Sequence, residues 1–208
     1  MPQVPLNELV DIAKAGTHLV SFPTDTVPAL AARPEQADLI YEAKQRSQTK
    51  PLILMGGNLD DLWAYVAGTA AEREIWQRVA EKYLPGALTL VLPASDRLPR
   101  AMNPTDPTTI GIRVPYHPIA QHILTLTRPL ATTSVNRSGE PALQTLEEIN
   151  AQFPEVYTLS PAALKAIEAE VGPVTPQTPQ SSGLPSTVAK WTGQGWEILR
   201  QGEVVIEG

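Results

Sequence analysis

Two short pairs of polar residues, far apart in the chain, carry the clearest chemical pattern in this sequence. Lys44 and Arg46 place two long cations one residue apart, and Ser134 and Asn136 place a hydroxyl and an amide with the same spacing. Cations neutralise phosphate charge, and small polar groups can fix phosphate oxygens or a bound metal. Either pair alone is weak, because cations are also favoured at an ordinary helix C-terminus. Together the pairs indicate a site for a polyanion.

The usual phosphate-binding and metal-binding motifs are missing from the sequence. It contains no G-x-x-x-x-G-K-[ST] and no G-x-G-x-x-G, so a bound nucleotide would be held by neither a P-loop nor a Rossmann turn. The absence of cysteine excludes disulfides, thiol catalysis and Cys-ligated zinc. Three histidines are too few for a His-rich metal site, and we interpret His117 and His122 as capping or packing residues.

Composition indicates a globular chain with a real core. The 208 residues are 42% hydrophobic and 18% charged, and the net charge of −6 speaks against a general nucleic-acid coat. No apolar run approaches the roughly 18–20 residues of a membrane span. Residues 1–9 lack the apolar segment of a secretory signal, so the expected location is the cytoplasm.

The cation pair is expected at the end of a helix. Residues 6–15 read as a first helix and 18–22 as a strand, followed by a hydroxyl-rich strand-to-loop transition over 24–30. In a helix over 35–44, Ala37, Ile40 and Lys44 share one apolar stripe. Lys44 therefore ends the buried face, and its ammonium must reach a polar cavity or a partner.

The remaining elements alternate between strands and helices. Capping boxes at Thr69/Glu72 and Thr145/Glu148 open two helices, and Ile75, Val79 and Tyr83 form the expected core face of the first. Further helices are expected at 117–127 and 162–171, and further strands at 51–55, 87–92, 109–114 and 130–134. A hairpin is expected from two strand-like segments, 186–191 and 196–199. This interleaving predicts an α/β fold in a single domain, 1–208: one twisted mixed β-sheet with helices packed around it.

Proline is over-represented, with 21 residues, about 10% of the chain against a usual ~5%. Residues 172–185 hold Pro173, Pro176, Pro179 and Pro185 and read as a mobile loop, a plausible lid because it leads into Ser186. The four tryptophans are expected to fill the core or cover the sheet: Trp63, Trp76, Trp191 and Trp196.

An ordered series of motifs resembles one known family. The series consists of PTDTV at 23–27, Lys44-x-Arg46 with Pro51-Leu52, PGALT at 85–89, IRVP at 112–115 with His117-Pro118, Ser134-x-Asn136 with Ser138-Gly139, PSTV at 185–188, and ILR at 198–200 with Gly202. In this order and spacing the chain resembles the YrdC/Sua5 family of L-threonylcarbamoyladenylate synthases over residues 16–203.

The resemblance implies a fold and a reaction. It implies a single YrdC-like domain of the short type, with a central concave cavity that is positively charged. The family makes threonylcarbamoyl-AMP and pyrophosphate from L-threonine, bicarbonate or CO2, and ATP. A downstream tRNA threonylcarbamoyl transferase then makes the t6A modification in tRNAs that read ANN codons.

The resemblance also implies residue roles. Lys44, Arg46, Ser134 and Asn136 match the catalytic tetrad, and all four belong to the ATP site with Lys50, Thr109, Ala142 and Arg200. The L-threonine site would comprise Thr26, Arg113, Thr132 and Ser186, with Arg113 on the substrate carboxylate. No side-chain metal site is implied, and Mg2+ would arrive with ATP.

Departures from the family pattern keep two alternatives open. The chain has Pro28-Ala29 where the family usually has Tyr-Gly, Met55 where a histidine is often present, and Leu84 and Val135 at two further motif positions. Pro28-Ala29 keeps open a paralogue with a different carbamoyl acceptor. The second alternative is a non-catalytic module that binds tRNA or double-stranded RNA in the same cavity, which the acidic pI of about 5.1 disfavours.

Overall fold

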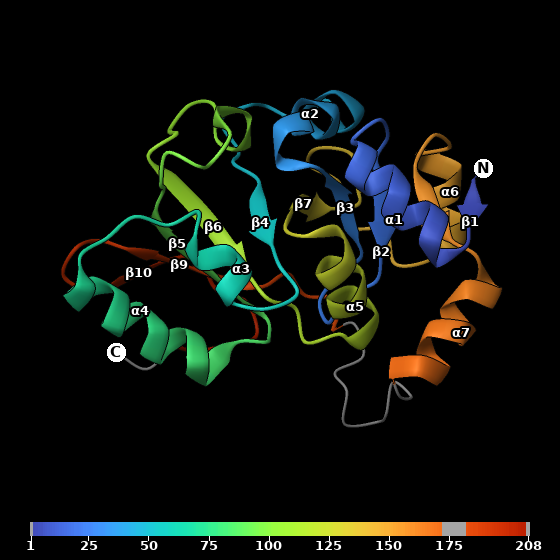
Figure 1. Ribbon diagram of the computed structural model, residues 1–208. Helices are drawn as coiled ribbons and strands as arrows, with labels where there is room; N and C mark the ends of the chain where they lie inside the picture. Colours follow the sequence, from blue (N-terminus) through green and yellow to red (C-terminus); the bar gives the residue numbers. More distant parts are fainter. Residues whose placement is uncertain (1, 172–181, 207–208) are drawn as a thin grey trace.

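A computed structural model describes residues 2–171 and 182–206, and its framework is one ten-stranded mixed sheet (Figure 1). Across the sheet the strands lie in the order β1-β8-β2-β3-β7-β4-β6-β5-β9-β10. Their bounds are β1 Gln3–Val4, β2 Val20–Phe22, β3 Ala29–Ala32, β4 Ile53–Met55, β5 Leu88–Pro93, β6 Thr109–Arg113, β7 Leu130–Ser134, β8 Tyr157–Leu159, β9 Thr187–Trp191 and β10 Trp196–Arg200.

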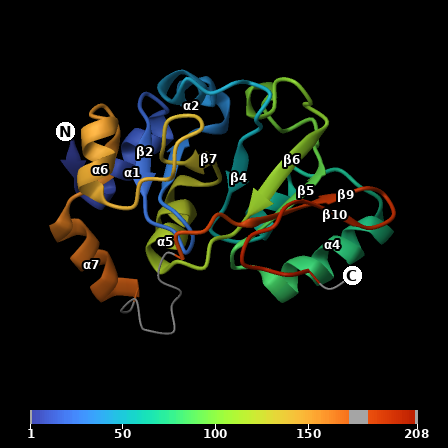
Figure 2. The ribbon, with the colours of Figure 1, turned by 180° about the vertical axis from the view of Figure 1, so that it is seen from behind.

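Helices pack around this sheet, and the two chain ends lie near its opposite edges (Figures 1 and 2). The α-helices are α1 Leu6–Ala15, α2 Asp38–Lys44, α3 Asp60–Trp63, α4 Ala70–Tyr83, α5 Pro118–Thr127, α6 Leu146–Gln152 and α7 Pro161–Val171. Two short 3-10 helices cover Pro34–Gln36 and Arg100–Met102. No helix in the described ranges is long and apolar enough to cross a membrane. The predicted α/β class, a mixed sheet with helices around it, is confirmed.

The central strands bury both of their faces. Successive side chains of a strand point to opposite sides, so Leu30 and Ala31 of β3 enter two different hydrophobic clusters. The first cluster is covered by α2, α3, α4 and α6, and the second cluster by α1, α5 and α7. Such two-sided burial holds the strand ends rigidly, and these ends carry the polar motif residues.

Locally encoded features agree with the sequence analysis. Both capping boxes are present, with Thr69 and Thr145 as the N-caps of α4 and α6. The predicted C-terminal hairpin is the antiparallel pair β9 and β10. Trp76 is fully buried and Trp191 nearly so, while Trp63 and Trp196 pack on the same cluster, as expected of core residues.

Several expectations were wrong in detail. The strands β1, β3 and β8 and the short helix α3 were not predicted, and β3 lies where a strand-to-loop transition was expected. The buried face of α4 is formed by Trp76 and Ala80, whereas the predicted Ile75, Val79 and Tyr83 are only partly buried. The large Trp76 indole decides the rotation of this helix, because it packs edge-on against Trp191 at a centroid distance of 6.3 Å.

The proline-rich segment is described only in part. Residues 172–181 of the expected mobile loop lie outside the described residues. The backbone N–H groups of Ser182 and Gly183 donate to the carbonyl oxygens of Asp25 and Thr26, at 3.1 and 3.0 Å. The approach to Ser186 therefore runs along the Thr24–Thr26 turn.

Candidate active site

A cavity of about 430 Å3 opens beside the second hydrophobic cluster. Its walls come from strands β3, β4, β5, β6 and β7, from the segments that follow α2 and the 3-10 helix Arg100–Met102, and from the C-terminal hairpin. Eight of the twelve residues proposed from the sequence line it, namely Thr26, Arg46, Thr109, Arg113, Thr132, Ser134, Ser186 and Arg200. Their positions range from 26 to 200, so the fold gathers them from nearly the whole chain.

Strand alternation explains the floor of the cavity. On β6, Thr109, Gly111 and Arg113 face it, and the intervening Ile110 and Ile112 are buried in the first hydrophobic cluster. Gly111 leaves room at the centre because it has no side chain; a Cβ there would lie 3.1 Å from a methyl of Thr89.

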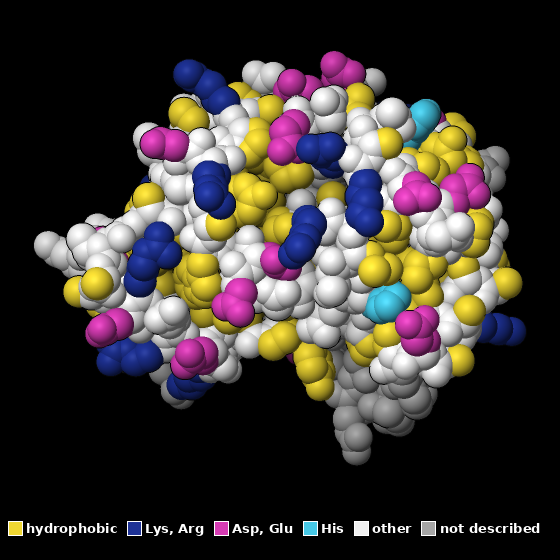
Figure 3. Space-filling view, viewed as in Figure 1, with side chains coloured by type: hydrophobic (Ala, Val, Ile, Leu, Met, Phe, Trp, Pro, Cys, Tyr) yellow, Lys and Arg dark blue, Asp and Glu magenta, His cyan; other side chains and the backbone are white. Residues whose placement is uncertain are grey.

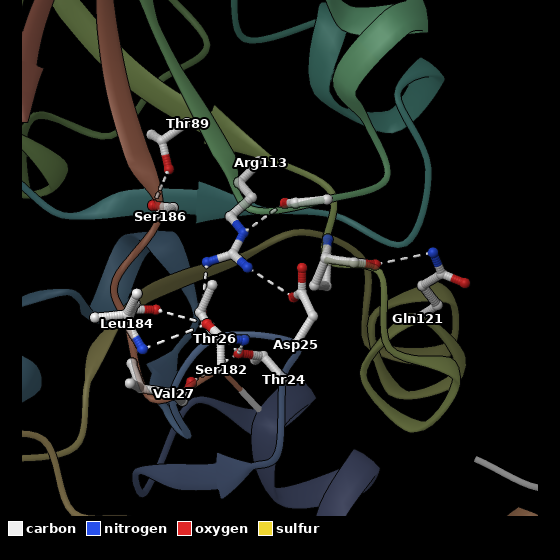
Figure 4. Close-up of polar contacts among 12 residues, drawn as sticks. Thr24, Asp25, Thr26, Val27, Thr89, Arg113, Gln121, Ser182, Leu184 and Ser186 are labelled. Atoms are coloured by element: carbon white, nitrogen blue, oxygen red, sulfur yellow. Dashed lines mark hydrogen bonds and ion pairs between the residues drawn. The ribbon is translucent and has the colours of Figure 1, made fainter. Parts of the chain in front are cut away.

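Arg113 anchors one end of the cavity and is held on three sides (Figure 4). Its Nε donates to the carbonyl oxygen of Gly86 at 3.1 Å, and its Nη1 donates to the hydroxyl of Thr26 at 2.9 Å. Its Nη2 forms a 2.6 Å ion pair with Asp25. Burial lowers the pKa of the Arg113 guanidinium, while the charge of Asp25 opposes that shift and favours the protonated form.

Ser186 and Arg200 adjoin the same end. Arg200 donates to the Ser186 carbonyl oxygen through Nε and Nη2, at 3.0 and 2.9 Å, and the Ser186 hydroxyl lies 2.9 Å from that of Thr89. The chain after Arg200 folds tightly onto this segment, since a Cβ on Gly202 would lie 2.4 Å from the Pro185 carbonyl oxygen. A larger residue at position 202 would clash with the backbone on both sides of Ser186.

Of the catalytic tetrad implied by the resemblance, Arg46 and Ser134 line the cavity, and Lys44 and Asn136 lie behind Ser134 and contact it. Lys44 Nζ donates to the carbonyl oxygen of Ser134 and, at 2.8 Å, to Asn136 Oδ1. The Ser134 hydroxyl donates to the same Asn136 oxygen at 2.6 Å. Burial, followed by the charges of Arg46 and Lys50, lowers the pKa of the Lys44 ammonium to about 7. Lys44 is thus buried and paired, as its place on the apolar stripe of α2 required.

Arg46 lines the cavity, and within the described part of the chain it donates to two backbone oxygens, those of Lys50 at 3.1 Å and Pro51 at 3.2 Å. Lys44, Lys50, Asn136 and Ala142 do not line the cavity itself, and Lys50 is exposed. Lys44 and Asn136 reach it only through their contacts with Ser134.

The hydroxyls of Thr132 and Thr109 are also engaged within the protein, like those of Thr26, Ser134 and Ser186. Thr132 donates to the Ile53 carbonyl oxygen at 3.1 Å, which ties β7 to β4. Thr109 donates to Asp106 at 3.2 Å and accepts from Asn103 at 3.3 Å.

Three charged residues near the cavity had no role in the sequence analysis. Asp25 stands between two threonines of a recognised motif, but nothing local to the sequence identifies Arg113 as its partner. Asp106 and Lys190 line the cavity. The alternation of Ser186, which precedes β9, with Val188 and Lys190 on β9 could have indicated Lys190.

The charges on the cavity wall are mostly cationic. Among the described residues its charged lining consists of Arg46, Arg113, Lys190, Arg200 and one acid, Asp106. No group of three or more His, Cys, Asp or Glu that could hold a metal ion occurs within the described ranges. On the face of the molecule in Figure 3, basic and acidic side chains are interspersed without a broad basic patch. The excess of cationic side chains on the wall suits a small anionic ligand.

The residues that depart from the family pattern lie in different places. Ala29 and Met55 line the cavity, whereas Pro28 lines a separate small apolar cavity between β2 and α6. His117 is the N-cap residue of α5 but makes no capping hydrogen bond with its side chain. It is buried, which agrees with a packing role.

Comparison with known proteins places the chain in a family. The model of the Sua5/YciO/YrdC family, described as "Telomere recombination", matches residues 12–202. The chain belongs to this family.

Relatives with assigned names agree with that placement. The threonylcarbamoyl-AMP synthase of Pyrococcus abyssi is 34% identical over 139 residues, which cover 65% of this chain and 40% of that protein. The synthase of Chromohalobacter salexigens is 34% identical over 150 residues, or 70% of this chain and 79% of that protein. The match thus spans less than half of the archaeal relative and most of the bacterial one.

A solved structure is similar over nearly the whole chain. The crystal structure of P. abyssi Sua5 complexed with L-threonine has a TM-score of 0.76 and 29% sequence identity, and the match covers 95% of this chain and 54% of that chain.

Proposed function

We propose that this chain is a threonylcarbamoyl-AMP synthase. It would join L-threonine, bicarbonate or CO2, and ATP to give threonylcarbamoyl-AMP, releasing pyrophosphate. One observation carries the proposal: a single cavity brings the tightly held Arg113 together with Arg46 and the hydroxyl of Ser134. The names of the synthase relatives and the L-threonine in the P. abyssi complex support it.

The Arg113 end suits the amino acid. A guanidinium is a good partner for a carboxylate, and Thr26 and Ser186 present hydroxyls on the same wall. Thr132 completes the proposed threonine site from β7. In this arrangement the amine of threonine points into the cavity, where it can attack CO2 to form the carbamate.

The Lys44 and Arg46 end suits the nucleotide. The carbamate oxygen attacks the α-phosphate, the bond to the bridging oxygen breaks, and pyrophosphate leaves. Charge spreads over phosphate oxygens during this step, so positioned cations and hydrogen-bond donors stabilise it. We assign this task to Lys44, Arg46, Ser134 and Asn136, with further nucleotide contacts from Lys50, Thr109, Ala142 and Arg200. Mg2+ would enter with ATP and neutralise phosphate charge.

The wider setting follows from the same proposal. We propose that residues 1–208 act as one YrdC-like domain in the cytoplasm and supply a tRNA threonylcarbamoyl transferase that makes t6A. A carbamate is short-lived in water, so the site must limit solvent during turnover.

Pyrophosphate release tests the proposal. The protein is incubated with ATP, Mg2+, bicarbonate and one amino acid at a time, and the adenylate is identified by mass spectrometry. L-Threonine is expected to give the fastest release, and omitting bicarbonate should remove it. Release with another amino acid but not with threonine would instead support the paralogue. Salt-resistant RNA binding without ATP consumption would support the RNA-binding module.

A further inference from the structure

A buried carboxylate lies directly behind the cavity wall. Asp25 and Arg113 form an ion pair whose side chains are only 2% and 5% exposed. Arg113 lines the cavity but Asp25 does not, and Figure 4 shows the Asp25 carboxylate pointing toward the Arg113 guanidinium. Both the proposed threonine contacts and the proposed nucleotide contacts omit Asp25.

The ion pair fixes the direction of the guanidinium. Its contacts with Asp25 and Thr26 come from the turn after β2, and that with Gly86 comes from the segment before β5. A guanidinium has five N–H donors, and these three contacts use one on each nitrogen. One N–H on each Nη is left to donate to a ligand in the cavity that Arg113 lines.

Charge balance also requires an acid here. Arg113 is buried and lies near Arg200, whose charge disfavours a second cation. A buried charge without a partner is costly, and Asp25 supplies that partner. The other titratable neighbour of Asp25 is His117, which is buried and whose Nδ1 has no hydrogen-bond partner within the described residues. Burial lowers the pKa of His117, so its imidazole is neutral at neutral pH and does not compete with Arg113 for Asp25.

We propose that Asp25 is a positioning residue for the amino-acid end of the site: it holds the Arg113 guanidinium so that its remaining Nη donors are available to the substrate carboxylate. This inference rests on the proposed function. Asp25 acts through Arg113, and its loss should therefore weaken amino-acid binding while ATP binding is retained.

The test is calorimetric titration of Asp25→Asn with L-threonine and, separately, with ATP and Mg2+. Asn keeps the size and one oxygen but removes the charge. We expect L-threonine affinity to fall by about tenfold or more, as for loss of a charge-assisted hydrogen bond, and ATP affinity to change by less than about twofold. The matched control is Asp61→Asn, which removes the same charge from the Asp61–Arg128 ion pair on the surface and should leave both affinities unchanged.

A second measurement separates positioning from general stability. In an Arg113→Lys background the three-point contact is absent, so Asp25→Asn should have little further effect on L-threonine affinity. If Asp25→Asn does not fold, Asp25→Glu replaces it in both measurements, because Glu keeps the charge but displaces the carboxylate by one methylene.

Unchanged L-threonine affinity in Asp25→Asn would overturn the inference and leave the proposed function standing. Equal losses of L-threonine and ATP binding, or an undiminished effect in the Arg113→Lys background, would make Asp25 merely structural. Failure of the wild-type protein to bind L-threonine would overturn the proposed function, and the inference with it.

Discussion

The Arg113 end and the Lys44 end of the cavity hold their cations in opposite ways. Arg113 is paired with an acid, Asp25, and oriented by two further acceptors before any ligand arrives. Among the described residues, Lys44 and Arg46 have no acidic partner and donate only to neutral oxygens.

This difference teaches how one cavity can serve two substrates. A cation whose charge is balanced by an acid, as in the Arg113–Asp25 pair, adds no net charge. It recognises a small zwitterion through the fixed direction of its N–H donors. Uncompensated cations attract the most highly charged ligand available, which is a polyphosphate. Each of the following changes tests one side of this comparison.

The largest effect is expected for Arg113→Met. It should abolish L-threonine-dependent pyrophosphate release and destabilise the protein by about 3–5 kcal/mol, because the buried Asp25 carboxylate loses its partner. Urea unfolding measures the second effect. The double variant Asp25→Asn/Arg113→Met should recover much of the stability without the activity. A single variant as stable as the wild type would contradict the buried ion pair.

The next effect is expected at the opposite end. Lys44→Ala or Arg46→Ala should lower kcat/KM for ATP by at least about tenfold, since a charge-assisted contact with phosphate contributes about 1.5–3 kcal/mol. The unfolding midpoint of Arg46→Ala should stay near that of the wild type, because Arg46 is partly exposed and leaves no acid unpaired. That of Lys44→Ala should fall, because Lys44 is only 1% exposed and its loss opens a cavity and takes a donor from the Ser134 carbonyl oxygen. Lys165→Ala on the exposed side of α7 is the control and should be neutral. Wild-type pyrophosphate release in both variants would refute the assignment.

A smaller effect concerns substrate choice at the Arg113 end. L-Threonine should bind better than L-serine by about tenfold, the lower end of the roughly 10–200-fold that one methylene gives. Both amino acids offer the same carboxylate to Arg113, and the small Ala29 side chain on the cavity wall gives the threonine methyl limited contact. Calorimetric titration with both amino acids measures the ratio. An affinity ratio above about 200-fold would mean that other residues enclose the threonine methyl group tightly.

The smallest effect concerns pH. Because the pKa of Lys44 is about 7, its ammonium is largely deprotonated by pH 8, and phosphate binding must restore the proton. ATP affinity should therefore fall by about fivefold between pH 7 and 8, with proton uptake on binding. Calorimetry in buffers of different ionisation enthalpy detects that proton, and Lys44→Met should abolish the uptake.

The same pKa fixes the sign of a stability change in the free protein. Between about pH 7 and the ordinary lysine pKa of 10.5, the unfolded chain binds more protons at position 44 than the folded chain. The contribution of Lys44 to the free energy of unfolding therefore rises with pH in this window. A contribution that falls, when wild type and Lys44→Met are compared by urea unfolding at pH 7 and 9, would contradict the lowered pKa.

Much of this protein is determined by local sequence. The two capping boxes are read correctly because a Thr and the Glu three residues later contact each other within one helical turn. The burial of Lys44 was also predicted correctly, because residues spaced like Ala37, Ile40 and Lys44 share one face of a helix. The short strand β3 was missed because its four residues, Ala29–Ala32, have no alternation of polar and apolar types, being buried on both faces.

What only the tertiary structure decides is which distant residues meet. Asp25 contacts Arg113 across 88 positions, and Lys44 contacts Asn136 across 92. The sequence by itself determined the residue types of the site and the elements that carry them. The partners depend on the order of strands in the sheet, which brings β3 beside β7 and β4 beside β6. That order depends on burying both hydrophobic faces of the sheet at the same time. The burial involves helices from the whole chain, so no short segment of the sequence can predict it.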